Sequence, residues 1–145
     1  MELFSIGFIG LFSASFLSAT ILPMSSEGIL LLMLSQQYDP VSCLIIATIG
    51  NSLGGLTNYG LGMFGNAIWL KRFGIKEEKL MTFQKRIQKR IQKRGYLVAF
   101  FSWVPFIGDP MTVALGFFKA PFIPVLFFIV LGKFLRYLVF VLPFL

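Results

Sequence analysis

Two acidic side chains stand in apolar sequence, each at the same distance from a proline. Glu27 follows Pro23 by four positions and Asp109 follows Pro105 by four positions, in a chain with only six acidic residues. A carboxylate in the membrane interior is costly and indicates a functional role by default. We therefore expect the two acids to form part of a substrate-binding or proton-coupling site.

Two basic side chains lie close together in a later apolar stretch. Lys133 and Arg136 are three residues apart, a spacing that places both on one face of a helix. The planar guanidinium of Arg136 suits a phosphate or a carboxylate better than the point charge of Lys133 does. We assign both to the same site as the acids; the alternative is that the side chains reach out to the lipid–water interface.

Helix capping is the structural alternative for the residues around the prolines. Ser26 and Asp109 can accept hydrogen bonds from free N–H groups at the start of a helix, and Pro110 suits a first helical position. Capping and binding can coexist, so Ser26 stays in the expected site. Pro23, Pro105 and Pro110 are interpreted as the breaks of two hairpins.

Composition excludes several kinds of chemistry. The chain has no His and one Cys, so it cannot supply the Ser-His or Cys-His pair of a hydrolase or a zinc-type ligand set. Cys43 lies in an apolar run, where we expect it to be packed, and it has no partner for an intrachain disulfide. We expect no enzymatic activity, no metal and no cofactor.

The same composition is typical of an integral membrane protein. Hydrophobic residues make up 57% of the 145 residues and charged residues only 13%, about half of the roughly 25% usual in soluble domains. A soluble protein this small cannot bury so much apolar surface, so lipid must cover the remainder. Residues 1–145 are expected to form a single all-α membrane domain.

Two stretches are long enough to cross a bilayer, and another is interrupted. Residues 41–65 and 121–143 each exceed the ~20 residues that span a hydrocarbon core of ~30 Å. The apolar residues 96–118 are broken at 105–110, and each arm of about ten residues reaches only mid-bilayer. We expect a re-entrant helical hairpin there.

The two halves of the sequence repeat with an offset of 82 residues. With this offset Pro23 corresponds to Pro105, Glu27 to Asp109, Leu44 to Leu126, Gly50 to Gly132 and Leu53 to Leu135. Residues 3–65 and 95–145 are the two expected repeats, each a re-entrant hairpin followed by a transmembrane helix. Because each half holds one complete crossing, the repeat is inverted, as in many secondary transporters. The alternative for residues 3–22 is a full span.

Small and polar residues of the first span are candidates for contacts between helices. Gly50 and Gly54 are spaced for the close approach of another helix, and we expect both, with Gly132, to serve helix packing. The same Gly-rich surface favours a homodimer. Asn51 corresponds to Lys133 in the repeat; it either joins the site or forms a hydrogen bond between helices.

A basic segment joins the two repeats. Ten of the 13 basic residues lie between Lys71 and Arg94, which by the positive-inside rule places residues 71–94 in the cytoplasm and both chain ends outside. We prefer this interpretation to nucleic-acid binding. Residues 66–94 are expected to form an amphipathic helix on anionic lipid; the alternative is a solvated linker.

These features resemble the DedA family of membrane proteins, also called SNARE-associated or VTT proteins, and most closely its short YqaA-like branch. The matching stretches are residues 22–27, 50–65, 102–116 and 132–137. The resemblance implies two re-entrant hairpins and the movement of polar lipids between leaflets. It further implies proton-coupled recycling of undecaprenyl phosphate or phosphatidylethanolamine, as associated with bacterial relatives, whereas eukaryotic relatives resemble scramblases.

The sequence departs from the family pattern at three positions. The longer branch of the family has two Arg residues around the second hairpin where this chain has Ser102 and Gly108, and Gly55 replaces an Asp that is frequent in the family. The basic groups that would hold a phosphate are therefore missing unless Lys133 and Arg136 replace them. For this reason the resemblance does not identify the lipid.

Together, the residues and the resemblance predict a transporter or scramblase for phosphate-bearing lipids in a bacterial inner membrane. Helix breaks at 23–27 and 105–110 would direct two half-helix N-termini toward each other, where the helix dipole favours an anionic headgroup. The expected partners are lipids with anionic headgroups, protons and a second copy of the chain. The alternatives are a membrane scaffold without transport and an exporter of small ions or drugs.

Overall fold

The structure is a computed structural model that describes residues 2–20, 26–72 and 108–145, with the pairs 85–86, 89–90 and 93–94. Its principal elements are α1 (Glu2–Thr20), α2 (Ser26–Ser35), α3 (Pro40–Arg72), α5 (Gly108–Phe117), α6 (Phe122–Val141) and the 3-10 turn η2 (Leu142–Phe144). No strand occurs in the described residues, so the all-α prediction is confirmed there. The breaks at Pro23 and Pro105, and most of the amphipathic segment 66–94, lie outside the described residues.

Two helices are long and apolar enough to cross a membrane. Their membrane-length parts are Pro40–Gly65, with 26 residues, and Phe122–Phe144, with 23 residues, in agreement with the two expected spans. α3 continues beyond Gly65 to Arg72 as one helix of 33 residues. The first long helix therefore does not end at residue 65, where the sequence placed the end of the first repeat.

The start of α3 is fixed by its cap. The Asp39 carboxylate accepts hydrogen bonds from the hydroxyl of Ser42 at 2.6 Å and from its backbone N–H at 2.8 Å. Both bonds lower the pKa of Asp39, and the bond from the hydroxyl has the larger effect. Pro40 follows at the first helical position, where its missing N–H costs nothing. Asp39 is thus the N-cap of α3.

The helix boundaries follow the offset that the sequence predicts. α2 and α5 both have ten residues, and they begin at Ser26 and Gly108, 82 positions apart. α3 and α6 begin at Pro40 and Phe122, again 82 positions apart. The starts of both helix pairs are thus separated by the offset found in the matching residues.

The two short helices also end in the same way. Gln37 and Lys119, which are repeat counterparts, have positive φ angles of 63° and 52°. Matching hydrogen bonds surround them: Gln37 N–H to Leu34 O, Tyr38 N–H to Met33 O, Lys119 N–H to Gly116 O and Ala120 N–H to Leu115 O. This pattern is a Schellman motif. It ends each short helix and turns the chain into the long helix that follows.

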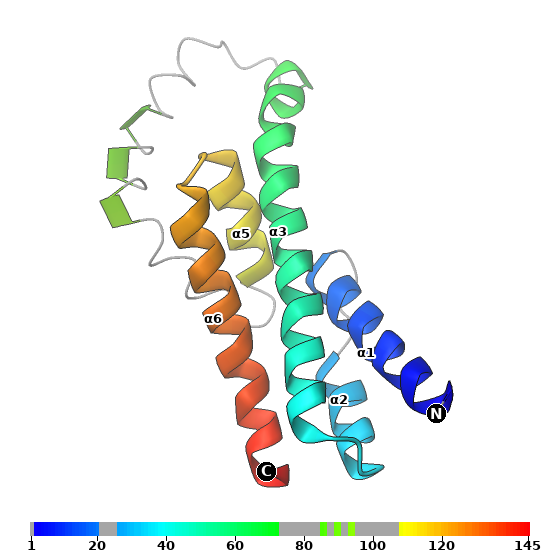
Figure 1. Cartoon of the computed structure of the whole chain (residues 1–145). Helices are drawn as coiled ribbons and strands as arrows, with labels where there is room; N and C mark the ends of the chain where they lie inside the picture. Colours follow the sequence, from blue (N-terminus) through cyan, green and yellow to red (C-terminus); the bar gives the residue numbers. More distant parts are fainter. Residues whose placement is uncertain (1, 21–25, 73–84, 87–88, 91–92, 95–107) are drawn as a thin grey trace.

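The long helices run antiparallel, and the short ones lie against them (Figure 1). α1 and α2 form a hairpin beside the first part of α3, because Phe8 near the start of α1 meets Tyr38 just after α2, with ring centroids 5.5 Å apart. α5 lies against the other part of α3. α2 runs toward the N-terminal end of α3 and α5 toward its other end.

Glycines of α3 allow its neighbours to approach closely. A Cβ at Gly50 would lie 2.7 Å from the backbone oxygen of Phe12, and one at Gly54 would lie 2.6 Å from that of Phe16. Both glycines therefore pack against α1, which agrees with the expected role in helix packing. This contact corrects the expectation that the Gly50–Gly54 face is free for a second copy of the chain. The homodimer stays a prediction without this support.

The contact between α3 and α5 gives a matched pair of stability predictions. A Cβ at Gly62 would collide with the backbone of Val113 and Phe117, whereas no described atom lies within 4 Å of a Cβ at Gly60. We expect Gly60→Ala to preserve or raise the melting temperature, because Ala favours a helix over Gly by about 1 kcal/mol. Gly62→Ala should lower it by roughly 5 °C, since overpacking costs ~1–3 kcal/mol. Thermal unfolding in detergent measures both, and equal shifts would contradict the backbone contact.

Candidate functional site

The first ion pair of the site joins α6 to the start of α5. The ammonium of Lys133 donates a hydrogen bond to Asp109 Oδ1 at 2.9 Å. The Lys133 side chain is fully buried, whereas 26% of the Asp109 side chain is exposed. Lys133 is held inside the helix bundle. The alternative in which its side chain reaches the lipid–water interface is therefore wrong. Asp109 also lies in the first turn of α5, where its charge is favourable toward the helix dipole.

The second ion pair joins the same face of α6 to the start of α2. Arg136 contacts Glu27 through its guanidinium, and each side chain is only 16% exposed. Glu27 lies in the first turn of α2, just as Asp109 does in α5. The two acids that correspond in the repeat thus occupy equivalent helix positions. Each has its own basic partner, and both partners come from one face of one helix.

A hydrogen bond adjoins the second ion pair. The hydroxyls of Ser26 and Tyr137 lie 2.7 Å apart, with either able to donate, and both side chains are fully buried. Consecutive residues of α6, Arg136 and Tyr137, therefore hold consecutive residues of α2, Ser26 and Glu27. The guanidinium carbon of Arg136 is also 6.0 Å from the centroid of the Tyr137 ring. The first turn of α2 is fixed to α6 by both contacts.

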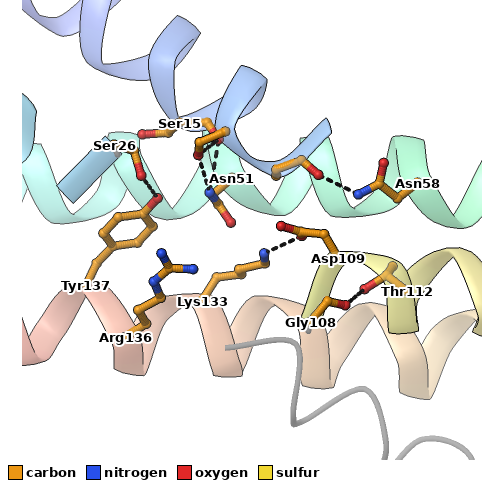
Figure 2. Close-up of polar contacts among 12 residues, drawn as sticks. Ser15, Ser26, Asn51, Asn58, Gly108, Asp109, Thr112, Lys133, Arg136 and Tyr137 are labelled. Atoms are coloured by element: carbon orange, nitrogen blue, oxygen red, sulfur yellow. Dashed lines mark hydrogen bonds and ion pairs between the residues drawn. The ribbon is translucent and has the colours of Figure 1, made fainter. Parts of the chain in front are cut away.

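Two buried amides tie α1 to α3. Asn51 donates to the backbone oxygen of Ser15 and to the hydroxyl of Ser18, both at 3.0 Å, and Asn58 donates to the backbone oxygen of Ala19. Asn51 and Asn58 are each 2% exposed. These bonds between helices are the plainer of the two roles expected for Asn51. The Asn51 side chain nevertheless borders the site, as Figure 2 shows.

The polar side chains of α6 leave the helix in one direction. Figure 2 shows Lys133, Arg136 and Tyr137 directed toward the residues drawn on α1, α2, α3 and α5. The spacing i, i+3, i+4 puts all three on one helix face. Their partners on the short helices lie within the first turns, where free N–H groups and the helix dipole favour negative charge. This arrangement can bind an anion. In the structure, the carboxylates of Asp109 and Glu27 are the anions paired with Lys133 and Arg136.

The structure brings together most of the residues that the sequence assigned to the site. Glu27, Asp109, Lys133 and Arg136 form the two ion pairs, and Ser26 and Asn51 border them. Pro110 lies in the first turn of α5, and Gly132 is buried in α6. Pro23, Pro105 and Ser102 lie outside the described residues.

Two buried polar residues of the cluster were not predicted. Tyr137 is fully buried and bonds Ser26, and its position four residues after Lys133 was a signal that it shares that helix face. Thr112 is also fully buried and donates to the backbone oxygen of Gly108 at 2.9 Å within α5. A Thr inside a short apolar helix gives no such signal, because it commonly bonds its own backbone.

The chain is similar to known membrane proteins along most of its length. The model of the VTT domain matches residues 22–144. The inner membrane protein YqaA of Escherichia coli is 40% identical over 128 residues, which cover 88% of this chain and 83% of YqaA. A protein of Haemophilus influenzae named only as uncharacterized is 34% identical over 135 residues, covering 88% of this chain and 80% of its own length. No solved structure matches the chain.

These similarities settle the family and the location. The family match covers nearly all of the chain, including both ion pairs and both membrane-length helices. A relative of 40% identity is an inner membrane protein, and two helices here are apolar enough to cross a membrane, so the predicted location in the inner membrane is confirmed. The chain belongs to the DedA family of VTT-domain membrane proteins.

Proposed function

We propose that this protein moves phosphate-bearing lipids between the leaflets of the inner membrane and that protons accompany the movement. The observation that carries the proposal is the two largely buried ion pairs, Lys133–Asp109 and Arg136–Glu27, which join α6 to the first turns of two short helices. A charged side chain inside a membrane domain is expensive, and four such side chains in one place indicate a transport site. Membership in the VTT-domain family agrees with a transporter-like role.

In this proposal the carboxylates hold the places that a phosphate takes during transport. Lys133 and Arg136 are each neutralised by one acid, so a phosphate can bind them only by displacing a carboxylate. A displaced carboxylate in a nonpolar site is stable only when it is protonated. Each displacement therefore takes up a proton, and this exchange couples the lipid to the proton gradient.

The same proposal places the two short helices as inner arms of re-entrant hairpins. α2 and α5 each have ten residues, about 15 Å of helix, or half of a hydrocarbon core of ~30 Å. They run in opposite directions, as do the long helices that follow them (Figure 1). Two inverted repeats that meet at mid-membrane would then present both helix N-termini to one headgroup, with residues 71–94 in the cytoplasm.

Vesicles reconstituted with the purified protein test the proposal. Fluorescent phosphatidic acid or fluorescent phosphatidylcholine is placed in one leaflet, and a quencher outside follows its movement with and without a pH difference. We expect phosphatidic acid, whose phosphate is free to pair with Lys133 and Arg136, to move several-fold faster when the gradient is imposed. Phosphatidylcholine should show little effect, because the choline group already neutralises its phosphate. Lys93→Gln, a change at an exposed residue outside the site, should behave as wild type.

The other outcomes identify the alternatives. Equal movement of both lipids at any pH would indicate a passive scramblase, and the proton coupling would be wrong. Vesicles in which no lipid moves would favour a membrane scaffold. Release of an entrapped small anion or drug without lipid movement would favour an exporter that uses the same carboxylates.

A further inference from the structure

The amide oxygen of Asn51 is buried and accepts no hydrogen bond from any described residue. Its orientation is fixed, because the amide nitrogen donates to Ser15 and Ser18 on α1 and the oxygen must then point away from that helix. Leaving a buried acceptor unpaired is unfavourable, because the oxygen loses its hydrogen bonds to water and gains none in return. A buried unpaired group of this kind calls for an explanation.

Lys133 lies on the side to which this oxygen points. The Cε atom of Lys133 is 3.9 Å from the position of a Cβ at Gly55, and Gly55 is four residues after Asn51 on the same face of α3. Figure 2 shows the free oxygen of Asn51 directed from α3 toward α6 and the Lys133 ammonium in the space between Asn51 and Asp109. An ammonium has three N–H donors, and the bond to Asp109 uses one.

We propose that the amide oxygen of Asn51 is a second acceptor for Lys133, which holds the ammonium whenever Asp109 releases it. This inference rests on the proposed function, in which Asp109 releases Lys133 when it is protonated or displaced by a phosphate. Without a second acceptor, the fully buried ammonium would then be left unpaired in the membrane interior, which is strongly unfavourable for a charge. Asn51 makes it unnecessary for Lys133 to leave the site during the cycle.

The charges around Lys133 favour an amide at this position. Asp109 faces it from α5, and Arg136 follows on α6 with its own charge paired to Glu27 of α2. A carboxylate at residue 51 would hold Lys133 as a permanent ion pair and compete with Asp109. A neutral oxygen accepts the ammonium more weakly, so Asp109 can recover it. Asn51 would therefore be a positioning residue that keeps Lys133 available to the anion.

A double-mutant cycle in thermal stability tests this role without any measurement of transport. Asp109→Ala removes the first acceptor and Asn51→Leu removes the second. We expect the melting temperature of the double variant to fall about 5 °C further than the sum of the two single shifts, because only the double variant leaves Lys133 without an acceptor. In a Lys133→Met background the same cycle should be additive.

Asn58→Leu is the matched control, because Asn58 also donates to α1 and is equally buried. Its combination with Asp109→Ala should be additive. If the Asn51 double variant does not fold, adding Lys133→Met should recover folded protein, since no buried ammonium is then left without an acceptor. Additive shifts for Asn51 and Asp109, coupling that persists without Lys133, or no recovery by Lys133→Met would overturn the inference. Coupling in a protein that moves no lipid would instead contradict the proposed function alone.

Discussion

Replacing Arg136 alone by Met is expected to damage the protein far more than replacing Arg136 and Glu27 together. Arg136 is mostly buried and paired with Glu27, so its loss leaves a buried acid without a partner. Breaking such a pair costs ~3–5 kcal/mol, whereas replacing both members by apolar side chains is often nearly neutral. We expect Arg136→Met to lower the melting temperature by roughly 10 °C and Arg136→Met/Glu27→Leu to recover most of that loss.

Lipid movement should not recover with stability. Both variants lack the guanidinium that the proposal assigns to the phosphate, so both should be inactive in the vesicle assay. Arg136→Lys keeps a positive charge but not the two-pronged geometry, and it should retain stability better than activity. Lys93→Gln supplies the control at an exposed position. A double variant that transports at the wild-type rate would show that this ion pair only holds α2 in place.

Local sequence predicted the positions of the helices well. The apolar stretch 41–65 located α3 to within one residue of its start, where Asp39 and Pro40 form a local cap. The repeat offset, found from residues such as Pro23 and Pro105, also relates the helix boundaries. α3 continues past the span into the basic segment as far as Arg72, since a basic and polar composition does not by itself stop a helix.

Contacts between distant residues were predicted less well. Spacing on α6 shows that Lys133 and Arg136 share a face, but not which acid each one contacts. Ser26 and Tyr137 are 111 positions apart, and nothing local to either residue indicates that they meet. The spacing of Gly50 and Gly54 likewise indicated that both pack against a helix. The same spacing is expected whether that helix is α1 or belongs to a second copy of the chain, so the sequence could not distinguish the two.

Knowing the partners also changes what neutralisation of the acids should do. From the sequence, Glu27→Gln and Asp109→Asn should insert and fold like wild type, because neither change strands a buried charge. The structure corrects this expectation, since the changes leave Arg136 and Lys133 without a carboxylate. We now expect both variants to be less stable than wild type. The remaining amide oxygen can still accept a hydrogen bond, so the loss should be smaller than for Arg136→Met.

Glu27→Gln and Asp109→Asn should affect the coupling of lipid movement to the proton gradient much more than they affect stability. A Gln or Asn side chain cannot take up a proton, so displacement by a phosphate no longer depends on protonation of that residue. We expect movement of fluorescent phosphatidic acid to become slower in Glu27→Gln and Asp109→Asn vesicles and insensitive to the pH difference across the membrane. Asp39→Asn is the matched control, because Asp39 is an acid outside the membrane-length helix that already accepts two hydrogen bonds from Ser42. It should retain the full response to the gradient. If both site variants kept that response, Glu27 and Asp109 would serve only to fix the first turns of α2 and α5, and the protons would have to bind elsewhere.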